Sequence, residues 1–369
     1  MGKIQSTVAV GLSGGVDSSA ALYLLQQEWE TVIGASHDIC VDSKSCNDET
    51  LGRARLLCEN RGVPYYRFNM IDEFHSRVIT DFADSYRIGK TPNPCVRCNE
   101  RVRFSLFYHI LQKQAIQDGL LDNGEPLYFA TGHYARKSTL FGYPVIKKGI
   151  DVTKDQSYML YRINPGILPY ILFPLGDKTK KEIVAIAGKQ GLPGSSVKES
   201  QDICFVPEKY TDFLANYFGK ETLYNAGNIF DNQGNLLGKH RGYMHYTIGQ
   251  RQGLGLADGP WYVLKVNPEN NTITVSRKEE LPESSFFISE TNWFIPPKVV
   301  MRESGSDKIT AEVKIRYGAP SIPCNIEFID SDDGENRIVV TLDESSVITP
   351  GQSAVVYLDD KVVGGGIIN

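Results

Sequence analysis

The 369-residue sequence contains no apolar run of the roughly 20 residues that a membrane-spanning helix needs. It also has no excess of positive charge: its formal net charge of −5 gives no bulk support for nucleic-acid binding. A local basic patch would escape such a count, so this class of partner stays open. The N-terminal residues lead into a strand pattern with neither the apolar stretch nor the cleavage site of a secretory signal. We therefore expect a cytoplasmic protein that does not contact a membrane.

Cysteine is scarce and its spacing is irregular. An odd number, seven, spread over a chain of this length argues against a disulfide framework. Cys95 and Cys98 form a Cys-x-x-Cys pair, whereas a structural zinc site needs about four ligands. The other five cysteines show no second pair at zinc-finger spacing; they are Cys40, Cys46, Cys58, Cys204 and Cys324. A zinc module is therefore not expected.

The stretch Gly11-Leu12-Ser13-Gly14-Gly15-Val16-Asp17-Ser18 is the first strong signal of function. It is neither Gly-x-Gly-x-x-Gly nor a Walker loop. It follows an apolar strand pattern and precedes a helical one, so backbone N–H groups and the positive helix end meet there and can bind phosphate. Glycines alone would fit an ordinary turn as well. Ser-Gly-Gly-x-Asp-Ser, however, resembles the PP-loop of the ATP pyrophosphatases, in which Asp17 can hold a metal ion that bridges phosphates.

Strands alternate with helices from the N-terminus to residue 206. Strands are predicted at 31–35, 64–68 and 127–130, and helices at 48–60 and 71–86. This order predicts an α/β doubly wound parallel sheet, which binds ligands at the carboxyl ends of its strands. His37, Gly132 and His133 follow such strand ends and predict walls of the nucleotide pocket. A lone histidine is more often structural, but the place of His133 after a strand end and beside a glycine leaves both roles open.

After residue 206 the pattern changes to a helix and glycine-punctuated strands. Because the chain exceeds the usual size of a single core, we predict three domains. They are a catalytic domain at 1–206, a small central domain at 207–280 and a C-terminal β-barrel at 281–369. We interpret 281–306 as linker and loop, and Asn270-Asn271 as the turn of a hairpin.

Asn93 and Pro94 predict the start of a helix, as an N-cap and a first helical residue. Cys95 and Cys98 would then share one face of its first turn. The positive helix end, with Arg97 and Arg101 nearby, is expected to lower the pKa of these thiols.

A second helix is predicted to begin near Lys154. A cation at a helix start is electrostatically misplaced, which favours an anionic partner there. Thr179 and Glu182 form a predicted capping box that we interpret as purely structural.

The whole chain resembles the tRNA-specific 2-thiouridylase family. The resemblance rests on segments in the family's order: 11–19, 91–94 with Cys98-Asn99, 130–134, 154–158, 203–205, 246–251, 316–317 and 350–352. It implies ATP-dependent 2-thiolation of the wobble uridine, position 34, in the anticodon stem-loop of tRNA. It also implies an adenine nucleotide alpha-hydrolase-like PP-loop fold.

The resemblance assigns a role to each matched residue. Gly11, Leu12, Ser13, Gly14, Gly15, Val16, Asp17, Ser18, His37 and Gly132 would line the ATP site. Asn93, Pro94 and Cys95 would contact the target base. His133, Lys154, Asp155, Gln156, Arg316, Tyr317 and Gln352 would contact tRNA. Cys204 would carry a persulfide and Cys98 would be the nucleophile.

The implied chemistry begins with ATP, which adenylates the uridine C2 oxygen because that oxygen is a poor leaving group. The persulfide sulfur, supplied by a sulfur-relay protein or a cysteine desulfurase, then attacks C2, and a Cys98–Cys204 disulfide remains for reduction. Mg²⁺ on the pyrophosphate would stabilise the developing charge. The base must leave its loop to reach the site, as single-stranded recognition permits.

Two positions depart from the family pattern. Many members carry aspartate where this chain has Cys95, and an apolar residue where it has His37. Cys95, Cys98 and Cys204 could instead hold three corners of a 4Fe–4S cluster. Two rival functions also stay open: a PP-loop adenylating synthetase, which would need no thiols, and a nucleotide-sensing or RNA-binding module without activity.

Overall fold

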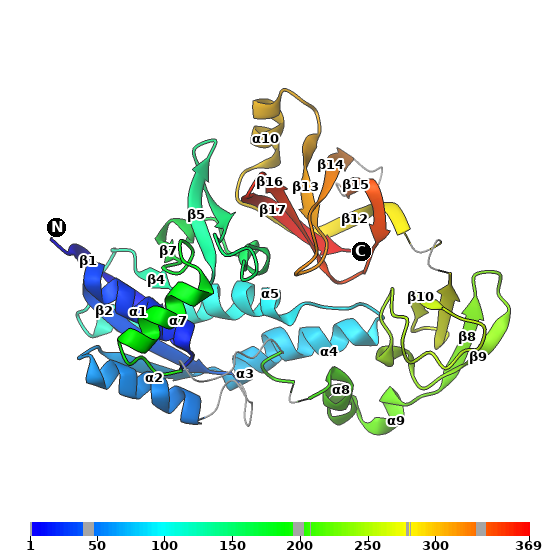
Figure 1. Cartoon of the computed structure of the whole chain (residues 1–369), viewed down its shortest axis with the longest axis horizontal. Helices are drawn as coiled ribbons and strands as arrows, with labels where there is room; N and C mark the ends of the chain where they lie inside the picture. Colours follow the sequence, from blue (N-terminus) through cyan, green and yellow to red (C-terminus); the bar gives the residue numbers. More distant parts are fainter. Residues whose placement is uncertain are drawn as a thin grey trace.

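The computed structural model describes residues 2–39, 48–194, 203–206, 208–277, 280, 282–329 and 337–369. Figure 1 shows three regions along the long axis: an α/β region that carries the N-terminus, a strand-rich region that carries the C-terminus, and a small sheet at the far end. None of the helices in these ranges is both long and apolar enough to cross a membrane.

The first region is built on five parallel strands. Their spatial order is β3 (Tyr65–Asn69), β2 (Trp29–Asp38), β1 (Ile4–Gly11), β4 (Tyr128–Ala130) and β7 (Ile171–Leu172). All four neighbouring pairs are parallel. The predicted doubly wound sheet is confirmed, and β1 lies at its centre.

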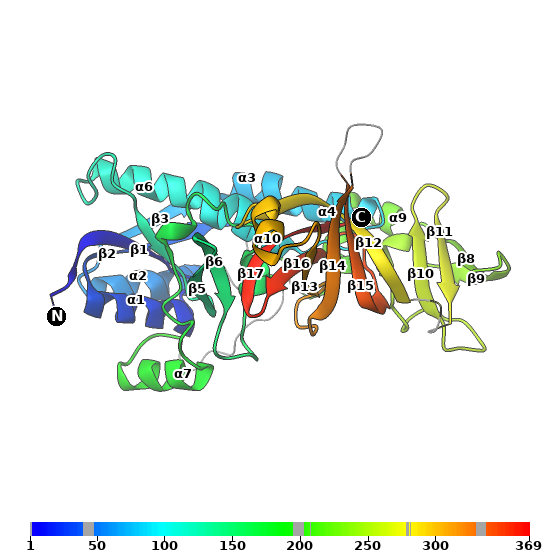
Figure 2. The same cartoon turned by 90° about the horizontal axis from the view of Figure 1, so that it is seen from above.

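Helices cover both faces of this sheet because β1 is apolar on both sides. Val8 and Val10 pack with helices α1, α2 and α7, while Ala9 points into the opposite core. Figure 2 shows the two groups of helices on opposite sides of the strands. The first group is α1 (Val16–Glu28), α2 (Asp48–Asn60) and α7 (Lys180–Lys189); the second is α3 (Ile71–Phe74), α4 (Thr80–Arg87), α5 (Pro94–Cys98) and α6 (Tyr108–Gln117). Two π-helical segments, His75–Ile79 and Asn99–Phe107, join α3 to α4 and α5 to α6.

The C-terminal region is a closed barrel of six antiparallel strands. Going round it, the strands are β12 (Pro282–Trp293), β15 (Arg337–Val347), β14 (Ile322–Ile329), β13 (Ile309–Lys314), β16 (Ser353–Leu358) and β17 (Lys361–Ile368). Pairing of β12 with β17 closes the ring. The predicted barrel is confirmed, and α10 (Pro297–Ser304) lies outside it.

The predicted linker at 281–306 is wrong, because β12 and α10 occupy most of it. The β12–β17 register shifts between Ser289 and Asn292, and Glu290 has a φ of 45° there. This bulge interrupts the two-residue alternation by which a strand is read from sequence.

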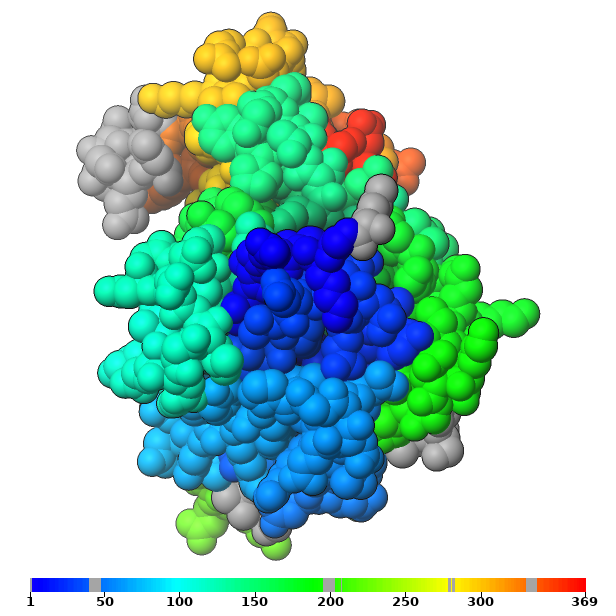
Figure 3. Space-filling model, turned by 90° about the vertical axis from the view of Figure 1, so that its left-hand side faces the viewer, coloured from blue at the N-terminus to red at the C-terminus, as the bar shows by residue number. Residues whose placement is uncertain are grey.

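A hairpin from the first region joins the barrel. It consists of β5 (Ala135–Leu140) and β6 (Tyr143–Lys148), and β6 pairs with β17 through Ile146–Val362 and Lys147–Lys361. Ile146 and Val362 belong to one continuous buried cluster that runs from the α/β sheet into the barrel. Figure 3 shows the green-teal surface of this segment standing against gold and red barrel residues. The first region and the barrel therefore share a core.

The small sheet has its own core around Ile229, Val263 and Ile273. Its order is β10 (Tyr262–Asn267), β11 (Thr272–Ser276), β8 (Gly227–Asp231) and β9 (Leu236–His240). The hairpin predicted at Asn270-Asn271 is confirmed as the β10–β11 turn. Helices α8 (Tyr210–Phe218) and α9 (Lys220–Leu223) precede the sheet.

Substitution of Ile146 by alanine tests the shared core. We expect it to lower the free energy of unfolding by about 2–4 kcal/mol, because a fully buried side chain at the β6–β17 junction leaves a cavity. Val152→Ala, at a position that is 83% exposed, is the control and should change stability by less than about 0.5 kcal/mol. The measurement is denaturant unfolding followed by far-UV and tryptophan signals. An Ile146→Ala effect as small as that of the control would contradict a shared core.

Candidate active site

The glycine-rich loop runs from the end of β1 to the start of α1. A Cβ on Gly14, whose φ is 71°, would lie 2.0 Å from the Thr50 carbonyl oxygen, so only glycine fits. The Ser18 hydroxyl accepts a hydrogen bond from the Ser13 N–H (3.2 Å) and donates one to the Gly15 carbonyl (3.1 Å). Gly15, the N-cap of α1, makes no side-chain cap bond. The loop is braced from within while N–H groups at the helix start stay available to an anion.

Neighbouring elements enclose this loop. A Cβ on Gly132 would lie 2.9 Å from the Asp17 carbonyl carbon and the Ser18 nitrogen, so the end of β4 packs directly on the loop. The Tyr134 hydroxyl donates to Asp17 Oδ1 at 2.7 Å, and Lys180 Nζ lies 2.7 and 2.8 Å from the two Asp17 oxygens. Loop residues 11–18 and Gly132 are thus brought together, as predicted. Lys180 also lies here, although no sequence motif singled it out.

His37 lies near the carboxyl end of β2, with its ring 4.4 Å from that of Phe107. Burial, and secondarily the positive charge of Arg103, lower its pKa to about 3. The imidazole is therefore neutral at physiological pH and offers an aromatic surface and a polar nitrogen rather than a charge.

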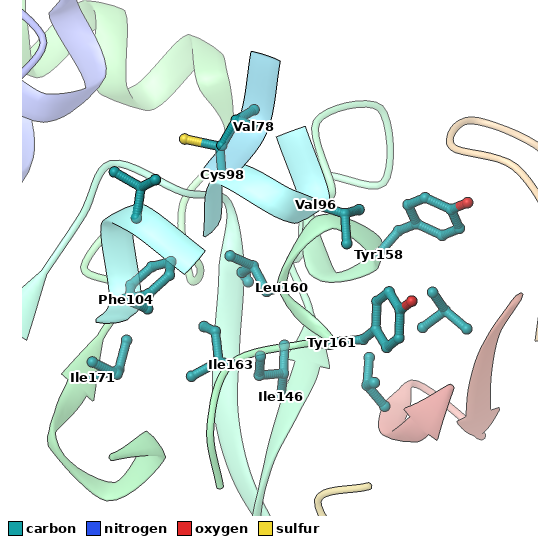
Figure 4. Packing of buried hydrophobic residues seen from close by; sticks show 14 of the residues in the cluster. Val78, Val96, Cys98, Phe104, Ile146, Tyr158, Leu160, Tyr161, Ile163 and Ile171 are labelled. Atoms are coloured by element: carbon teal, nitrogen blue, oxygen red, sulfur yellow. The ribbon is translucent and has the colours of Figure 1, made fainter. Parts of the chain in front are cut away.

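The predicted helix start at Asn93 is confirmed. Asn93 Oδ1 accepts a hydrogen bond from the Val96 N–H at 3.3 Å, and Pro94 is the first residue of α5. Cys95 is exposed, whereas Cys98 is only 7% exposed. Figure 4 shows Cys98 next to Val78, and both belong to the shared core.

The predicted lowering of the thiol pKa values is wrong. Desolvation by the surrounding protein raises the pKa of Cys95 to about 11, although that residue keeps contact with water, and burial also raises the pKa of Cys98. Desolvation of a thiolate outweighs the helix dipole here. Both thiols are therefore protonated at neutral pH.

Arg97 and Arg101 do not assist the thiols because acidic side chains bind them. Arg97 lies 2.8 Å from Glu290 and 3.2 Å from Glu100, and Arg101 lies 2.8 Å from Asp81. Arg162 joins the group through Glu100 at 2.5 Å and donates to the Glu290 carbonyl. This arginine–acid cluster (Asp81, Arg97, Glu100, Arg101, Arg162 and Glu290) ties the helix that carries Cys98 to strand β12 of the barrel.

Arg103 is the cation that does act on the thiols. Its charge lowers the pKa values of Cys95, Cys98, His37 and His133; for the two thiols this opposes the effect of desolvation. Its guanidinium donates to Asn99 Oδ1 at 2.7 Å, and Asn99 donates in turn to the Met159 carbonyl at 3.0 Å. The sequence motifs did not point to Arg103. Its spacing could have done so, because positions 95, 99 and 103 are four residues apart and fall on one face of a helix.

Cys204 is half-buried in the described segment 203–206, next to Phe205. The Phe205 ring packs edge-on against Phe74 and Phe82, with centroids 5.7 and 5.3 Å apart. Cys204 therefore packs against the buried cluster that contains Cys98. Its neighbour Phe205 contacts α3 and α4, which cover the same face of the sheet as α5.

The residues predicted to contact tRNA fall into two groups. Asp155 and Gln156 make local structural bonds: Asp155 Oδ1 accepts from Gly149 N (3.0 Å) and Gln156 Oε1 from Tyr134 N (2.9 Å). The helix predicted near Lys154 is shorter than expected, a single 3-10 turn at Ser157–Leu160. His133 is largely enclosed, and burial lowers its pKa to about 3 while Thr131 holds Nδ1 at 2.8 Å.

The second group comes from the barrel, which contacts the segment just before α5 at Thr91. Gln352 donates to the Thr91 carbonyl at 2.8 Å, and Tyr317 is 47% exposed with its ring 6.1 Å from that of Tyr158. Arg316 is held by the Val347 carbonyl (3.1 Å) and Thr349 Oγ1 (2.6 Å). In the ranges that the structure describes, no three His, Cys, Asp or Glu side chains form a group able to hold a metal ion. Cys40 and Cys46 lie outside those ranges.

The pH dependence of Cys95 alkylation tests the electrostatics of this helix. Because the reactive species is the thiolate, the iodoacetamide rate at Cys95 should rise with an apparent pKa near 11. Arg103→Met should move this midpoint to higher pH, since it removes the cation that opposes desolvation. Arg101→Met, which removes a cation already bound by Asp81, is the control and should leave the midpoint in place. Site-resolved mass spectrometry gives the rates, and a midpoint at or below the ordinary thiol value of about 8.5 would contradict the assignment.

Comparison with known proteins covers the whole chain. Three family models match in sequence: the tRNA methyl transferase HUP domain over residues 6–208, the tRNA methyl transferase PRC-barrel domain over 211–277 and the aminomethyltransferase beta-barrel domain over 283–368. A solved U34-tRNA thiolase, NcsA from Methanococcus maripaludis with its 4Fe–4S cluster, is 18% identical. The superposition covers 59% of this chain and 66% of the thiolase chain, with a TM-score of 0.34.

Full-length relatives are much closer. The tRNA-specific 2-thiouridylase MnmA 1 of Caldanaerobacter subterraneus subsp. tengcongensis is 39% identical, over 99% of this chain and 98% of its own length. The tRNA-specific 2-thiouridylase MnmA of Clostridioides difficile is 38% identical, over 98% of this chain and 97% of its own. Since both alignments run through all three regions of the fold, the chain belongs to the tRNA-specific 2-thiouridylase family.

Proposed function

We propose that this protein uses ATP to replace the C2 oxygen of the wobble uridine of tRNA, at position 34, by sulfur. The observation that carries the proposal is a PP-loop at the carboxyl edge of the sheet together with two thiols, Cys98 and Cys204, in one core on the same side of that sheet, in a chain of this family. A PP-loop synthetase that uses ammonia would not need this pair of thiols. The protein would work in the cytoplasm.

The three regions divide the work. Residues 1–206 bind ATP and carry out the chemistry, while 207–280 and 281–369 present the anticodon stem-loop of tRNA. Residues 11–18, His37 and Gly132 form the ATP site, and Asn93, Pro94 and Cys95 contact the everted base. Lys154 and the barrel residues Arg316, Tyr317 and Gln352 contact tRNA near the start of α5. Asp155, Gln156 and His133 shape the same edge through the hydrogen bonds described above.

The reaction begins when the uridine O2 attacks the α-phosphorus of ATP and pyrophosphate leaves. The terminal sulfur of a Cys204 persulfide then attacks C2, and AMP departs with the oxygen. Finally, Cys98 attacks the sulfur of Cys204, which releases 2-thiouridine and leaves a Cys98–Cys204 disulfide. An external thiol reduces this disulfide, and a sulfur-relay protein or a cysteine desulfurase reloads Cys204.

Asp17 has the chemistry of a Mg²⁺ ligand in this site. Mg²⁺ is usually bound through one or two carboxylates together with substrate phosphates, and Asp17 presents a partly exposed carboxylate beside the phosphate loop. The ion, when bound there, would balance charge on the leaving pyrophosphate. Loop residues do the rest, because their N–H groups orient the phosphates.

A 4Fe–4S cluster on Cys95, Cys98 and Cys204 is the second route, and the described residues do not favour it. Cys95 and Cys98 lie three residues apart on one turn, but Cys204 does not complete a metal-holding group with them. The persulfide route needs only Cys98 and Cys204, and we therefore prefer it.

Serine substitutions of the two thiols test the proposed reaction. Cys98→Ser and Cys204→Ser should each reduce 2-thiouridine formation by about a thousandfold or more, because serine can neither carry a persulfide nor form the disulfide. ATP affinity should stay unchanged. Cys324→Ala, at a buried barrel cysteine, is the control and should keep its activity. The assay combines ATP, Mg²⁺, a persulfide donor and unmodified tRNA with nucleoside analysis. Full activity of Cys204→Ser would contradict the mechanism.

Metal analysis separates the two sulfur routes. Protein purified without oxygen should contain far less than one cluster's iron and sulfide per chain, and Cys95→Ala should have the same content and retain thiolation. The reason is that Cys95 contacts the base but carries no sulfur in the persulfide route. Stoichiometric iron that disappears together with activity in Cys95→Ala would establish the cluster route instead.

A further inference from the structure

Lys180 is the first residue of α7, and its ammonium group lies at the nucleotide loop. Its Nζ is 2.7 and 2.8 Å from the two carboxylate oxygens of Asp17. Helix α7 packs with α1 in the same buried cluster, so the lysine reaches the loop from a rigid neighbouring element. Both side chains keep contact with water, at 20% exposure for Lys180 and 23% for Asp17.

The stability of α7 does not explain this lysine. A cation in the first turn of a helix opposes the helix dipole. The N-terminus is already capped by Thr179 and Glu182, which form the predicted capping box, and the Lys180 N–H donates to Asp151 Oδ2 at 3.0 Å. A partly exposed ion pair such as Lys180–Asp17 typically contributes little to stability, because water screens its charges. The Lys180 side chain is therefore not needed to cap α7, and its ion pair with Asp17 adds little to the stability of the fold.

The charge of Asp17 gives a reason for its presence. This carboxylate sits in the first turn of α1, beside the N–H groups that bind phosphate, and it would repel the phosphates of ATP if its charge were not balanced. An ammonium group on a flexible four-carbon stem can balance it and can also move to a phosphate oxygen close by. Phosphate is the stronger partner because it carries more charge and several acceptor oxygens.

We propose that Lys180 is a ligand of the β- and γ-phosphates of ATP and of the pyrophosphate that leaves. Asp17 holds the ammonium group at the loop until nucleotide arrives. Asp17 would hold the cation that accompanies ATP, and Lys180 would then move to the phosphates. This inference deepens the proposed function and rests on it only for the use of ATP.

The first test compares Lys180→Met with Lys181→Met. Lys181 is the adjacent, exposed lysine of α7, and its side chain makes no hydrogen bond or ion pair in the part of the chain that the structure describes. Calorimetric titrations with inorganic pyrophosphate, ATP and AMP are made on the full chain without tRNA, and thermal melts confirm that each variant is folded. Lys180→Met should weaken pyrophosphate and ATP binding by about tenfold or more and leave AMP binding unchanged, because a charge-assisted contact to the phosphates is lost. Equal pyrophosphate affinity in the two variants would overturn the proposal.

A double variant separates a phosphate ligand from a simple counter-ion of Asp17. Asp17→Asn combined with Lys180→Met removes both charges, and pyrophosphate binding is measured without divalent cations. If Lys180 contacts phosphate, the double variant should bind pyrophosphate several-fold more weakly than Asp17→Asn alone. If the two bind equally, Lys180 only neutralises Asp17 and the proposal is wrong. A protein that fails to thiolate tRNA and still shows the Lys180 effect would refute the proposed function and leave this inference intact.

Discussion

The ion pairs of the buried Arg97 guanidinium are the interactions on which the placement of helix α5 against the barrel depends. Arg97 is 7% exposed and stands between helix α5 and strand β12, with acids from α4, from the π-helical segment that continues α5 and from the barrel around it. A buried charge that loses its partners costs several kcal/mol, so the barrel cannot leave α5 without exposing or stranding Arg97. Two further contacts join the segment before α5 to the barrel: the Thr91 N–H donates to the Pro350 carbonyl at 2.9 Å, and Gln352 donates to the Thr91 carbonyl at 2.8 Å. The turn that carries Cys95 and Cys98 is thus fixed by a domain that lies at the other end of the sequence.

This arrangement also explains the chemistry of the thiols. The arginines nearest to them in sequence are neutralised by acids, and desolvation by the protein raises the pKa of both thiols, although Cys95 keeps contact with water. Thiols in that state are slow to oxidise or alkylate, because the thiolate is the reactive form. Arg103 is the group that opposes desolvation, and it is fixed through Asn99 to the backbone at Met159. Both thiols are therefore protonated and slow to react in this structure, and Arg103 is the cation that favours their thiolate forms.

Local features of the loop, of α5 and of the sheet could be predicted from the sequence, whereas the joining of the barrel to the first region could not. The PP-loop, the Asn93 cap and the parallel sheet depend on local rules, such as glycine geometry, capping and alternation of strands with helices, and all three are confirmed. The β5–β6 hairpin that joins the barrel could not be predicted, because strand pairing between Ile146 and Val362 leaves no local pattern. β12 was missed because the bulge at Glu290 breaks its alternation, and the thiol pKa values were misjudged because burial by distant segments cannot be read from neighbours in sequence.

The ion pairs at the glycine-rich loop and those at α5 differ in number and in solvent exposure. At the loop, Asp17 and Lys180 form a partly exposed pair, which suits the proposed exchange with a ligand that brings its own negative charge. At α5, the arginine–acid cluster is largely buried and multiply bonded, which suits a helix that must keep Cys98 in one place. Weak ion pairs near the nucleotide permit exchange, whereas strong ones behind the thiols resist it. The same interaction type therefore stands in two environments, and solvent exposure sets whether an ion pair holds its elements rigidly or can be exchanged for another partner.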